Sequence, residues 1–174
     1  TIALHLCKEQ AQILIGACRQ APYGKGKDTL VDTSVRKVWE MDAERIHFAN
    51  PAWGETLAVL LDEIETELGL GPASLDAHLY KMLLYEKGGF FLPHQDGERL
   101  DRMVATLVVV LPSEHEGGEL IVRHGDEETT IHFDEDGAVG IQYGAFYTDC
   151  PHEVKPIRSG MRLCLTYNLT LADD

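Results

Sequence analysis

From residue 77 onward, short apolar runs alternate with Gly, Pro and Asp, and this texture limits the possible folds more than any other feature of the chain. The runs are rich in Val, Ile, Leu, Thr and Tyr, which is typical of β-strands. The six clearest runs span residues 78–85, 104–111, 119–124, 128–133, 138–143 and 162–171. Shorter runs at 90–96 and 146–154 bring the total to about eight, the number of strands in a jelly roll.

The first third of the chain carries helical periodicity instead. Apolar residues at positions 11, 14, 15 and 18 predict a helix that begins near Lys8, and a second apolar stripe runs through 55–68 before Gly69. We expect the lysine- and arginine-containing segment 21–54 to form a loop; a flap that holds Arg36 over a functional site is the less favoured alternative. With no repeat or linker to divide it, the chain is predicted to be one domain, 1–174, with 1–76 as helical support and loop and 77–171 as the β core.

The charge of the chain restricts its partners. Its 15 lysines and arginines stand against 29 acidic residues, a net charge of −14. Nucleic acids and anionic membrane surfaces attract cationic proteins, so neither is an expected partner. No apolar run reaches the length of a membrane-spanning helix. The four cysteines form no CxxC pair, and we expect them to be reduced in a cytoplasmic protein.

The sharpest local feature is His94-Gln95-Asp96. Residues two apart on a strand point to the same side, so this imidazole and carboxylate can bind one ion. His152 supplies a second imidazole just before another expected strand. Two histidines and one carboxylate on one face of a metal leave the opposite positions open, as in non-haem Fe(II) oxygenases. Without His152, a strand-end turn explains the pair His94 and Asp96 equally well, and the other six histidines are interpreted as surface or packed residues.

Arg162 lies ten residues after His152, inside an otherwise apolar run. A guanidinium group that faces a core costs several kcal/mol unless a partner neutralises it. A dicarboxylic cosubstrate can supply that partner with bidentate geometry. An internal Asp or Glu is the less favoured partner.

These motifs, with the surrounding segments 83–91 and Gly117-Gly118-Glu119-Leu120, resemble the 2-oxoglutarate/Fe(II)-dependent dioxygenases, and within them the prolyl-4-hydroxylase-like branch. The resemblance covers roughly residues 77–171, and the segment 32–39 extends it toward the N-terminus. It implies a mainly β fold with N-terminal helices, built on a double-stranded β-helix, which is a cupin-like jelly roll.

The resemblance also implies hydroxylation of a C–H bond, coupled to oxidative decarboxylation of 2-oxoglutarate to succinate and CO2. The implied cofactors are Fe(II), 2-oxoglutarate and O2, with ascorbate in a supporting role. His94, Asp96 and His152 would bind Fe(II), and Arg162 would pair with the distal carboxylate of the cosubstrate. Tyr85, nine residues before His94, matches a tyrosine that relatives use at the cosubstrate.

One departure from the family pattern concerns the cosubstrate. Cys164 stands where some relatives carry a hydroxyl group, which leaves Thr106 or Thr166 as hydroxyl donors. A prolyl residue in a peptide, another protein side chain and a free small molecule all fit as substrate. Two rival functions stay open: a non-catalytic module that binds 2-oxoglutarate and metal, and a cupin-type metal protein with other chemistry, which requires a third imidazole near His94.

Overall fold

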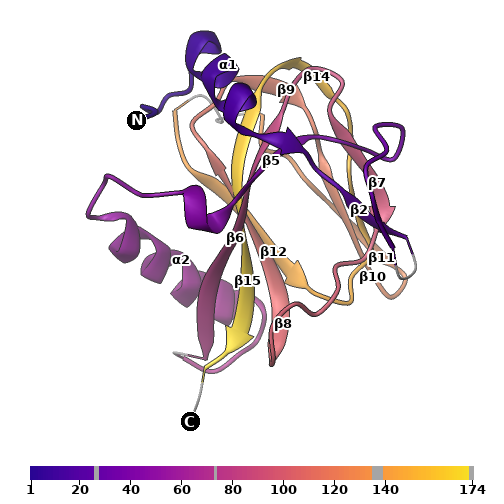
Figure 1. Ribbon diagram of the computed structural model, residues 1–174. Coiled ribbons are helices and arrows are strands. Elements are labelled where there is room, and N and C mark those ends of the chain that lie inside the picture. The colour runs from indigo at the N-terminus through magenta and orange to yellow at the C-terminus, as the bar shows by residue number, and fades with distance from the viewer. Residues whose placement is uncertain (26–27, 73, 135–138, 173–174) are drawn as a thin grey trace.

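The computed structural model describes residues 1–25, 28–72, 74–134 and 139–172 (Figure 1). Its two α-helices are α1 (Lys8–Ala17) and α2 (Trp53–Glu67), with a short 3-10 helix, η1 (Ala43–Arg45), between them. Both α-helices lie on the apolar stripes that predicted them. Among the described residues, no helix is both long and apolar enough to cross a bilayer. The four cysteines are unpaired, as expected.

The larger sheet has six antiparallel strands in the order β1-β5-β6-β15-β8-β12. Their bounds are β1 (Arg19–Gln20), β5 (Trp39–Asp42), β6 (Leu75–Tyr85), β15 (Arg162–Leu171), β8 (Met103–Leu111) and β12 (Gln142–Tyr147). Strand β15 pairs with β6 on one side and with β8 on the other. Its backbone groups are therefore bonded on both edges, which holds its side chains in fixed positions.

The smaller sheet has five strands in the order β11-β10-β13-β7-β4. Their bounds are β11 (Glu127–Ile131), β10 (Leu120–His124), β13 (His152–Val154), β7 (Phe90–His94) and β4 (Arg36–Lys37). Two further pairs join β9 (His115–Gly117) with β14 (Ile157–Gly160) and β2 (Tyr23–Lys25) with β3 (Asp28–Leu30). The described strands form sheets rather than one closed barrel, and the predicted mainly β jelly-roll fold is confirmed.

Two apolar clusters separate the layers. In the first, Leu14 of α1 and Ile64 of α2 are buried together with Leu84 of the larger sheet, so both helices cover the outer face of that sheet (Figure 1). The second cluster lies between the sheets and includes Leu83 and Tyr85. Adjacent residues of β6 thus face opposite layers, as the alternation of a strand requires. Tyr85 therefore faces the space between the sheets.

The structure corrects several sequence-based boundaries. The expectation of a helical first third with a loop over 21–54 is wrong where β1 to β5 lie, at residues 19–20, 23–25, 28–30, 36–37 and 39–42. These strands are two to four residues long, and β4 and β5 pair with β7 and β6, which are distant in sequence. The run expected at 138–143 begins in residues outside the described ranges, and the strand found there is β12, which pairs with β8 as far as Tyr147. Strands β9 and β14 were not predicted.

Candidate metal centre and binding pocket

The register of two antiparallel strands brings the predicted metal ligands together. His94 is the last residue of β7, His152 is the first residue of β13, and the two are direct partners in the ladder. Asp96 follows His94 by two residues and emerges at the same end of the sheet. One ligand atom from each of the three residues lies within 4.8 Å of the other two. This is the size of space in which a single metal ion can be bound.

Hydrogen bonds orient the two imidazoles. Nδ1 of His94 is 2.8 Å from the carbonyl oxygen of Leu92, and Nδ1 of His152 is 3.0 Å from that of Cys150. A carbonyl oxygen only accepts, so each Nδ1 carries the proton and donates. Each Nε2 is left with a lone pair, the form in which histidine binds a metal. Nε2 of His152 lies 3.8 Å from Oδ2 of Asp96, so this lone pair faces the shared space.

The carboxylate of Asp96 is held at both oxygens. Thr106 donates its hydroxyl to Oδ2 over 2.8 Å, and Nη2 of Arg99 donates to Oδ1 over 3.0 Å. Arg99 is itself stacked over the ring of Tyr80, 4.4 Å from its centroid. Burial raises the pKa of Asp96, but His152, Arg99 and the hydrogen bond from Thr106 outweigh it, so the pKa lies below its usual value. Asp96 is therefore an anion over the physiological pH range.

The electrostatic environment also favours neutral histidines. Burial, followed by the neighbouring His152, lowers the pKa of His94 to about 4. Burial likewise lowers the pKa of His152. Two neutral imidazoles and one carboxylate form the donor set of a facial triad, which suits Fe(II) and leaves positions for other ligands. The residues present thus fit the metal that the resemblance implies.

Arg162, the first residue of β15, is a buried cation to which the described residues offer no anionic partner. Its side chain is among the largest that the fold buries, with 2% of the residue exposed. Nη1 donates to the carbonyl oxygen of Gly118, the guanidinium lies 4.7 Å from the ring centroid of Tyr85, and Nε has no hydrogen-bond partner. Within the described ranges, no carboxylate lies at ion-pair distance. A buried charge of this kind calls for a bound anion.

One cavity of about 540 Å³ joins these groups, lined by the triad, Arg162, Tyr85, Thr106, Cys164 and Thr166 among other residues. Tyr85 forms the wall under the Arg162 guanidinium. Cys164 is buried beside it, and burial raises the pKa of its thiol, so it stays protonated. The Thr106 hydroxyl is bonded to Asp96, and the Thr166 hydroxyl donates to the Lys81 carbonyl over 3.3 Å. In this structure neither threonine is directed at Arg162.

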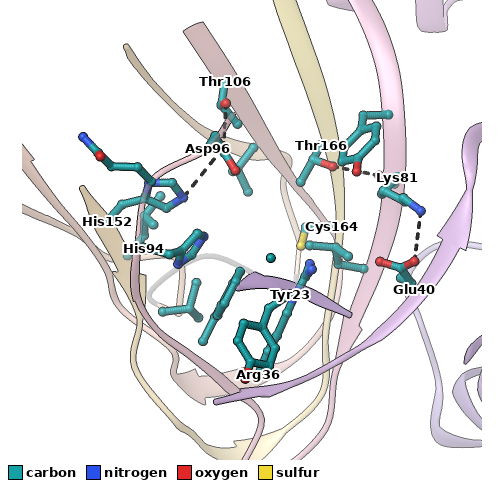
Figure 2. Close-up of a pocket in the computed structure, with 18 of the residues that line it drawn as sticks. Tyr23, Arg36, Glu40, Lys81, His94, Asp96, Thr106, His152, Cys164 and Thr166 are labelled. Atoms are coloured by element: carbon teal, nitrogen blue, oxygen red, sulfur yellow. Dashed lines mark hydrogen bonds and ion pairs between the residues drawn. The ribbon is translucent and has the colours of Figure 1, made fainter. Parts of the chain in front are cut away.

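A charge cluster whose inner members, Glu40 and Lys81, are buried forms the opposite wall of the cavity. Nζ of Lys81 donates to Oε1 of Glu40 over 2.9 Å and also to Asp42, and both carboxylates accept from Arg19. Glu40 is 2% exposed and Lys81 9%. Figure 2 shows the triad on one side of the pocket and the pair of Glu40 and Lys81 on the other.

Comparisons with known proteins agree with this geometry. Residues 80–170, just over half of the chain, match the family model of the 2OG-Fe(II) oxygenase superfamily. The chain belongs to this superfamily. No curated protein matches the sequence of this oxygenase.

Solved structures show the same fold for this oxygenase. A prolyl-4-hydroxylase from Pseudomonas putida matches 91% of the chain over 80% of its own length, at 22% identity and a TM-score of 0.57. A prolyl hydroxylase from Trichoplax adhaerens, solved with a hypoxia inducible factor peptide fragment, matches 95% over 76% of its own length, at 18% identity and a TM-score of 0.54. The viral collagen prolyl hydroxylase of Paramecium Bursaria Chlorella virus-1, in complex with 2OG, matches 96% over 92% of its own length, at 16% identity and a TM-score of 0.54. The expected membership of the 2-oxoglutarate/Fe(II) dioxygenases is confirmed, and the fold is similar to that of these prolyl hydroxylases.

Sequence reasoning missed several residues of this oxygenase pocket. It gave no role to Arg99, although this arginine lies three residues after Asp96 and is bonded to it. It also passed over Glu40 and Lys81, because two opposite charges 41 positions apart give no local signal. Arg36 was favoured as part of a loop, whereas it lies on β4 and lines the pocket. The basic stretch 25–37, with four lysines and arginines against two aspartates in a strongly acidic chain, was the available clue.

Proposed function

We propose that this oxygenase is an Fe(II)- and 2-oxoglutarate-dependent hydroxylase. His94, Asp96 and His152 bind the metal, and Arg162 binds the distal carboxylate of the cosubstrate. The observation that supports this most directly is that the triad and a buried, unpaired guanidinium line the same cavity. Its volume of about 540 Å³ is in the range of small-ligand pockets.

In this family, bound Fe(II) and 2-oxoglutarate supply the oxidation of a C–H bond by O2, with release of succinate and CO2. The two histidines offer Nε2 because their Nδ1 protons are held by backbone carbonyls. Thr106 and Arg99 fix the orientation of the Asp96 carboxylate, so that this side chain loses little conformational entropy when metal binds. Arg162 positions one end of the cosubstrate by paired hydrogen bonds, and the ring of Tyr85 keeps water from that guanidinium.

The neighbouring structures suggest where to look for the substrate. Three of them are named as prolyl hydroxylases, so a prolyl residue in a peptide is our first candidate. Another protein side chain and a free small molecule are the alternatives. Ascorbate belongs in the assay because it returns oxidised iron to Fe(II).

The test combines a binding measurement with an activity measurement. Calorimetry under nitrogen measures whether 2-oxoglutarate binds to the Zn(II)-loaded protein, and succinate is quantified after incubation with Fe(II), ascorbate, air and a panel of prolyl peptides and small molecules. We expect metal-dependent binding and substrate-dependent succinate. His94→Ala should abolish both, whereas His47→Ala, a matched change of an exposed histidine, should change neither.

The outcomes separate the competing functions. Metal-dependent binding of 2-oxoglutarate without succinate from any substrate would favour a non-catalytic binding module. Metal binding that is indifferent to 2-oxoglutarate would favour a cupin-type protein of other chemistry. If the wild-type protein neither binds 2-oxoglutarate nor forms succinate, and His94→Ala behaves like wild type, the proposal is wrong.

A further inference from the structure

The pocket is cationic although the protein as a whole is strongly acidic. Among the described residues, five cationic and two anionic side chains line it, in a chain whose net charge is −14. They are Arg19, Arg36, Lys81, Arg99 and Arg162, with Glu40 and Asp96. Charges of one sign that are concentrated inside a cavity with low-dielectric walls focus the electric field there and attract ligands of the opposite charge.

Ion pairs within the protein neutralise only part of this charge. Three of the five cations have carboxylate partners: Arg19 and Lys81 pair with Glu40 and Asp42, and Arg99 pairs with Asp96. For Arg36 and Arg162, no carboxylate of the described residues comes within ion-pair distance. Two guanidinium charges in the pocket are therefore left without an anion.

Arg36 enters the pocket from the N-terminal part of the chain and is held in place by several contacts. Its strand β4 pairs with β7 through Arg36 and Phe91, and its guanidinium carbon lies 4.5 Å from the centroid of the Phe91 ring. Nη1 donates to the carbonyl oxygen of Pro22 over 2.6 Å, whereas Nε is buried without a hydrogen-bond partner. The Phe91 ring in turn stacks on His94, 3.4 Å between centroids. This places a partly unsatisfied cation one ring away from the proposed metal site.

Arg36 and Arg162 act on the same region of the cavity. Burial raises the pKa of the Cys164 thiol and of the Tyr85 hydroxyl, and the charges of both arginines oppose that increase. Figure 2 shows Arg36 together with Tyr23 between the triad on one side of the pocket and the pair of Glu40 and Lys81 on the other. The two cations thus flank one space, and only one of them is assigned to the distal carboxylate of the cosubstrate.

Loading the site as proposed above does not remove the excess charge. The two positive charges of Fe(II) equal the two negative charges of 2-oxoglutarate, so both guanidinium charges remain in the total. On the basis of the proposed function, we propose that the primary substrate carries an anionic group, a carboxylate in the simplest case, and that Arg36 binds it. Arg36 is then a specificity-determining residue that selects acidic substrates.

The test uses matched pairs of probes that differ only in this charge. N-acetyl-L-proline is compared with N-acetyl-L-prolinamide, and the peptide acetyl-Glu-Pro-Gly-amide with acetyl-Gln-Pro-Gly-amide. Saturation-transfer NMR measures the binding of each to the protein loaded with Zn(II) and 2-oxoglutarate, which is diamagnetic and does not turn over. We expect strong saturation transfer to the acids and little to the amides.

Variants of Arg36 test whether this residue causes the preference for acids over amides. Arg36→Met should remove the signal of the acids, and Arg36→Lys, which keeps the charge, should retain part of it. Lys37→Met removes the same charge from the exposed neighbouring residue of β4 and should behave like wild type. Calorimetry should show that Arg36→Met changes the dissociation constant of 2-oxoglutarate by no more than about twofold. Circular dichroism and thermal unfolding check that each variant is folded.

The results separate this inference from the proposed function. Equal binding of acids and amides, or acid binding that survives in Arg36→Met, overturns the inference. So does a large loss of 2-oxoglutarate affinity in Arg36→Met, because Arg36 would then serve the cosubstrate. If wild-type protein binds no 2-oxoglutarate at all, the proposed function itself fails, whatever the probes do.

Discussion

Arg162→Met is a substitution for which stability and ligand binding should respond in different ways. Methionine is close in length to the aliphatic part of arginine, but it carries neither the charge nor the donors. In the wild-type protein Arg162 is 2% exposed, and its guanidinium faces no carboxylate of the described residues and leaves Nε unpartnered. The metal-free protein therefore contains a buried cation that is only partly compensated.

The magnitudes nearly cancel for stability. Removing the guanidinium loses a charged hydrogen bond to Gly118, about 1.5–3 kcal/mol, and contacts with the rings of Tyr85 and Phe133, up to about 2 kcal/mol. It also removes the desolvation penalty of a buried ion, which is several kcal/mol. We expect the free energy of unfolding of the metal-free protein to stay within about 2 kcal/mol of wild type.

The effect on binding should be much larger. Two charge-assisted hydrogen bonds to the distal carboxylate contribute about 1.5–3 kcal/mol each, so their loss raises the dissociation constant of 2-oxoglutarate by about 10²- to 10⁴-fold. Urea unfolding measures the stability, and calorimetry with the Zn(II)-loaded protein measures the affinity. The control ligand 2-oxopentanoate lacks the distal carboxylate and should bind equally to both proteins.

Two results would refute this reasoning. Unchanged affinity for 2-oxoglutarate would show that the anion binds elsewhere. A loss of more than about 4 kcal/mol in the free energy of unfolding would show that Arg162 is structurally paired rather than reserved for a ligand.

Three further predictions concern the surrounding groups. Because the pKa of His94 is about 4 in the fold and 6.5 as the unperturbed value, the unfolded chain binds the proton first, so the urea midpoint of metal-free protein should fall between pH 7 and 5, and fall less in His94→Gln. Glu40→Leu should cost about 3 kcal/mol in urea unfolding because Lys81 loses its buried partner, and the double variant with Lys81→Met should regain most of it. Gly118 has a φ of +74°, and in Gly118→Ala the new Cβ would clash with the Ile157 side chain and come within 3.0 Å of Arg162 Nη1. We expect a cost of about 2–4 kcal/mol and weaker 2-oxoglutarate binding. Gly125→Ala, at φ +60° with no atom within 4 Å of its Cβ, should cost only about 1 kcal/mol.

For each of these three predictions, a specific result would contradict it. A urea midpoint that is constant with pH would mean that the His94 imidazole is as easily protonated in the folded state as in the unfolded chain. A double variant as unstable as Glu40→Leu would mean that Lys81 is not the residue left uncompensated. Equal effects of the two glycine substitutions would show that backbone conformation, rather than contact with Ile157 and Arg162, governs position 118.

The long strands and both helices could be predicted because their signals are local. Strands β6, β8 and β15 are continuous runs of β-forming residues, and the apolar stripes of α1 and α2 have helical spacing. The short N-terminal strands β1 to β5, together with β9 and β14, were not predicted in this way. Strand β4 has two residues, and it exists because the edge of β7 is available for pairing, which no window of the sequence reveals.

The candidate site, like the fold, could be predicted only where its signals are local. His94, Asp96, His152 and Arg162 could be selected by motif and spacing, and the structure brings them to one cavity. The contacts of these residues could not be predicted. Thr106 was expected as a hydroxyl donor at the cosubstrate, whereas in the structure it donates to Asp96. This contact depends on the spatial position of β8 next to the loop after β7, which is set by tertiary packing rather than by local pattern.

The N-terminal origin of one wall has a consequence for how this oxygenase can be divided. The family model spans residues 80–170 and contains the triad and Arg162, but Tyr23, Arg36 and Glu40 enter the same cavity from upstream. A fragment cut at the family boundary would keep every metal ligand and lose one side of the chamber around them. Such a fragment, if it folds, should still bind the metal but should discriminate poorly among the molecules it admits.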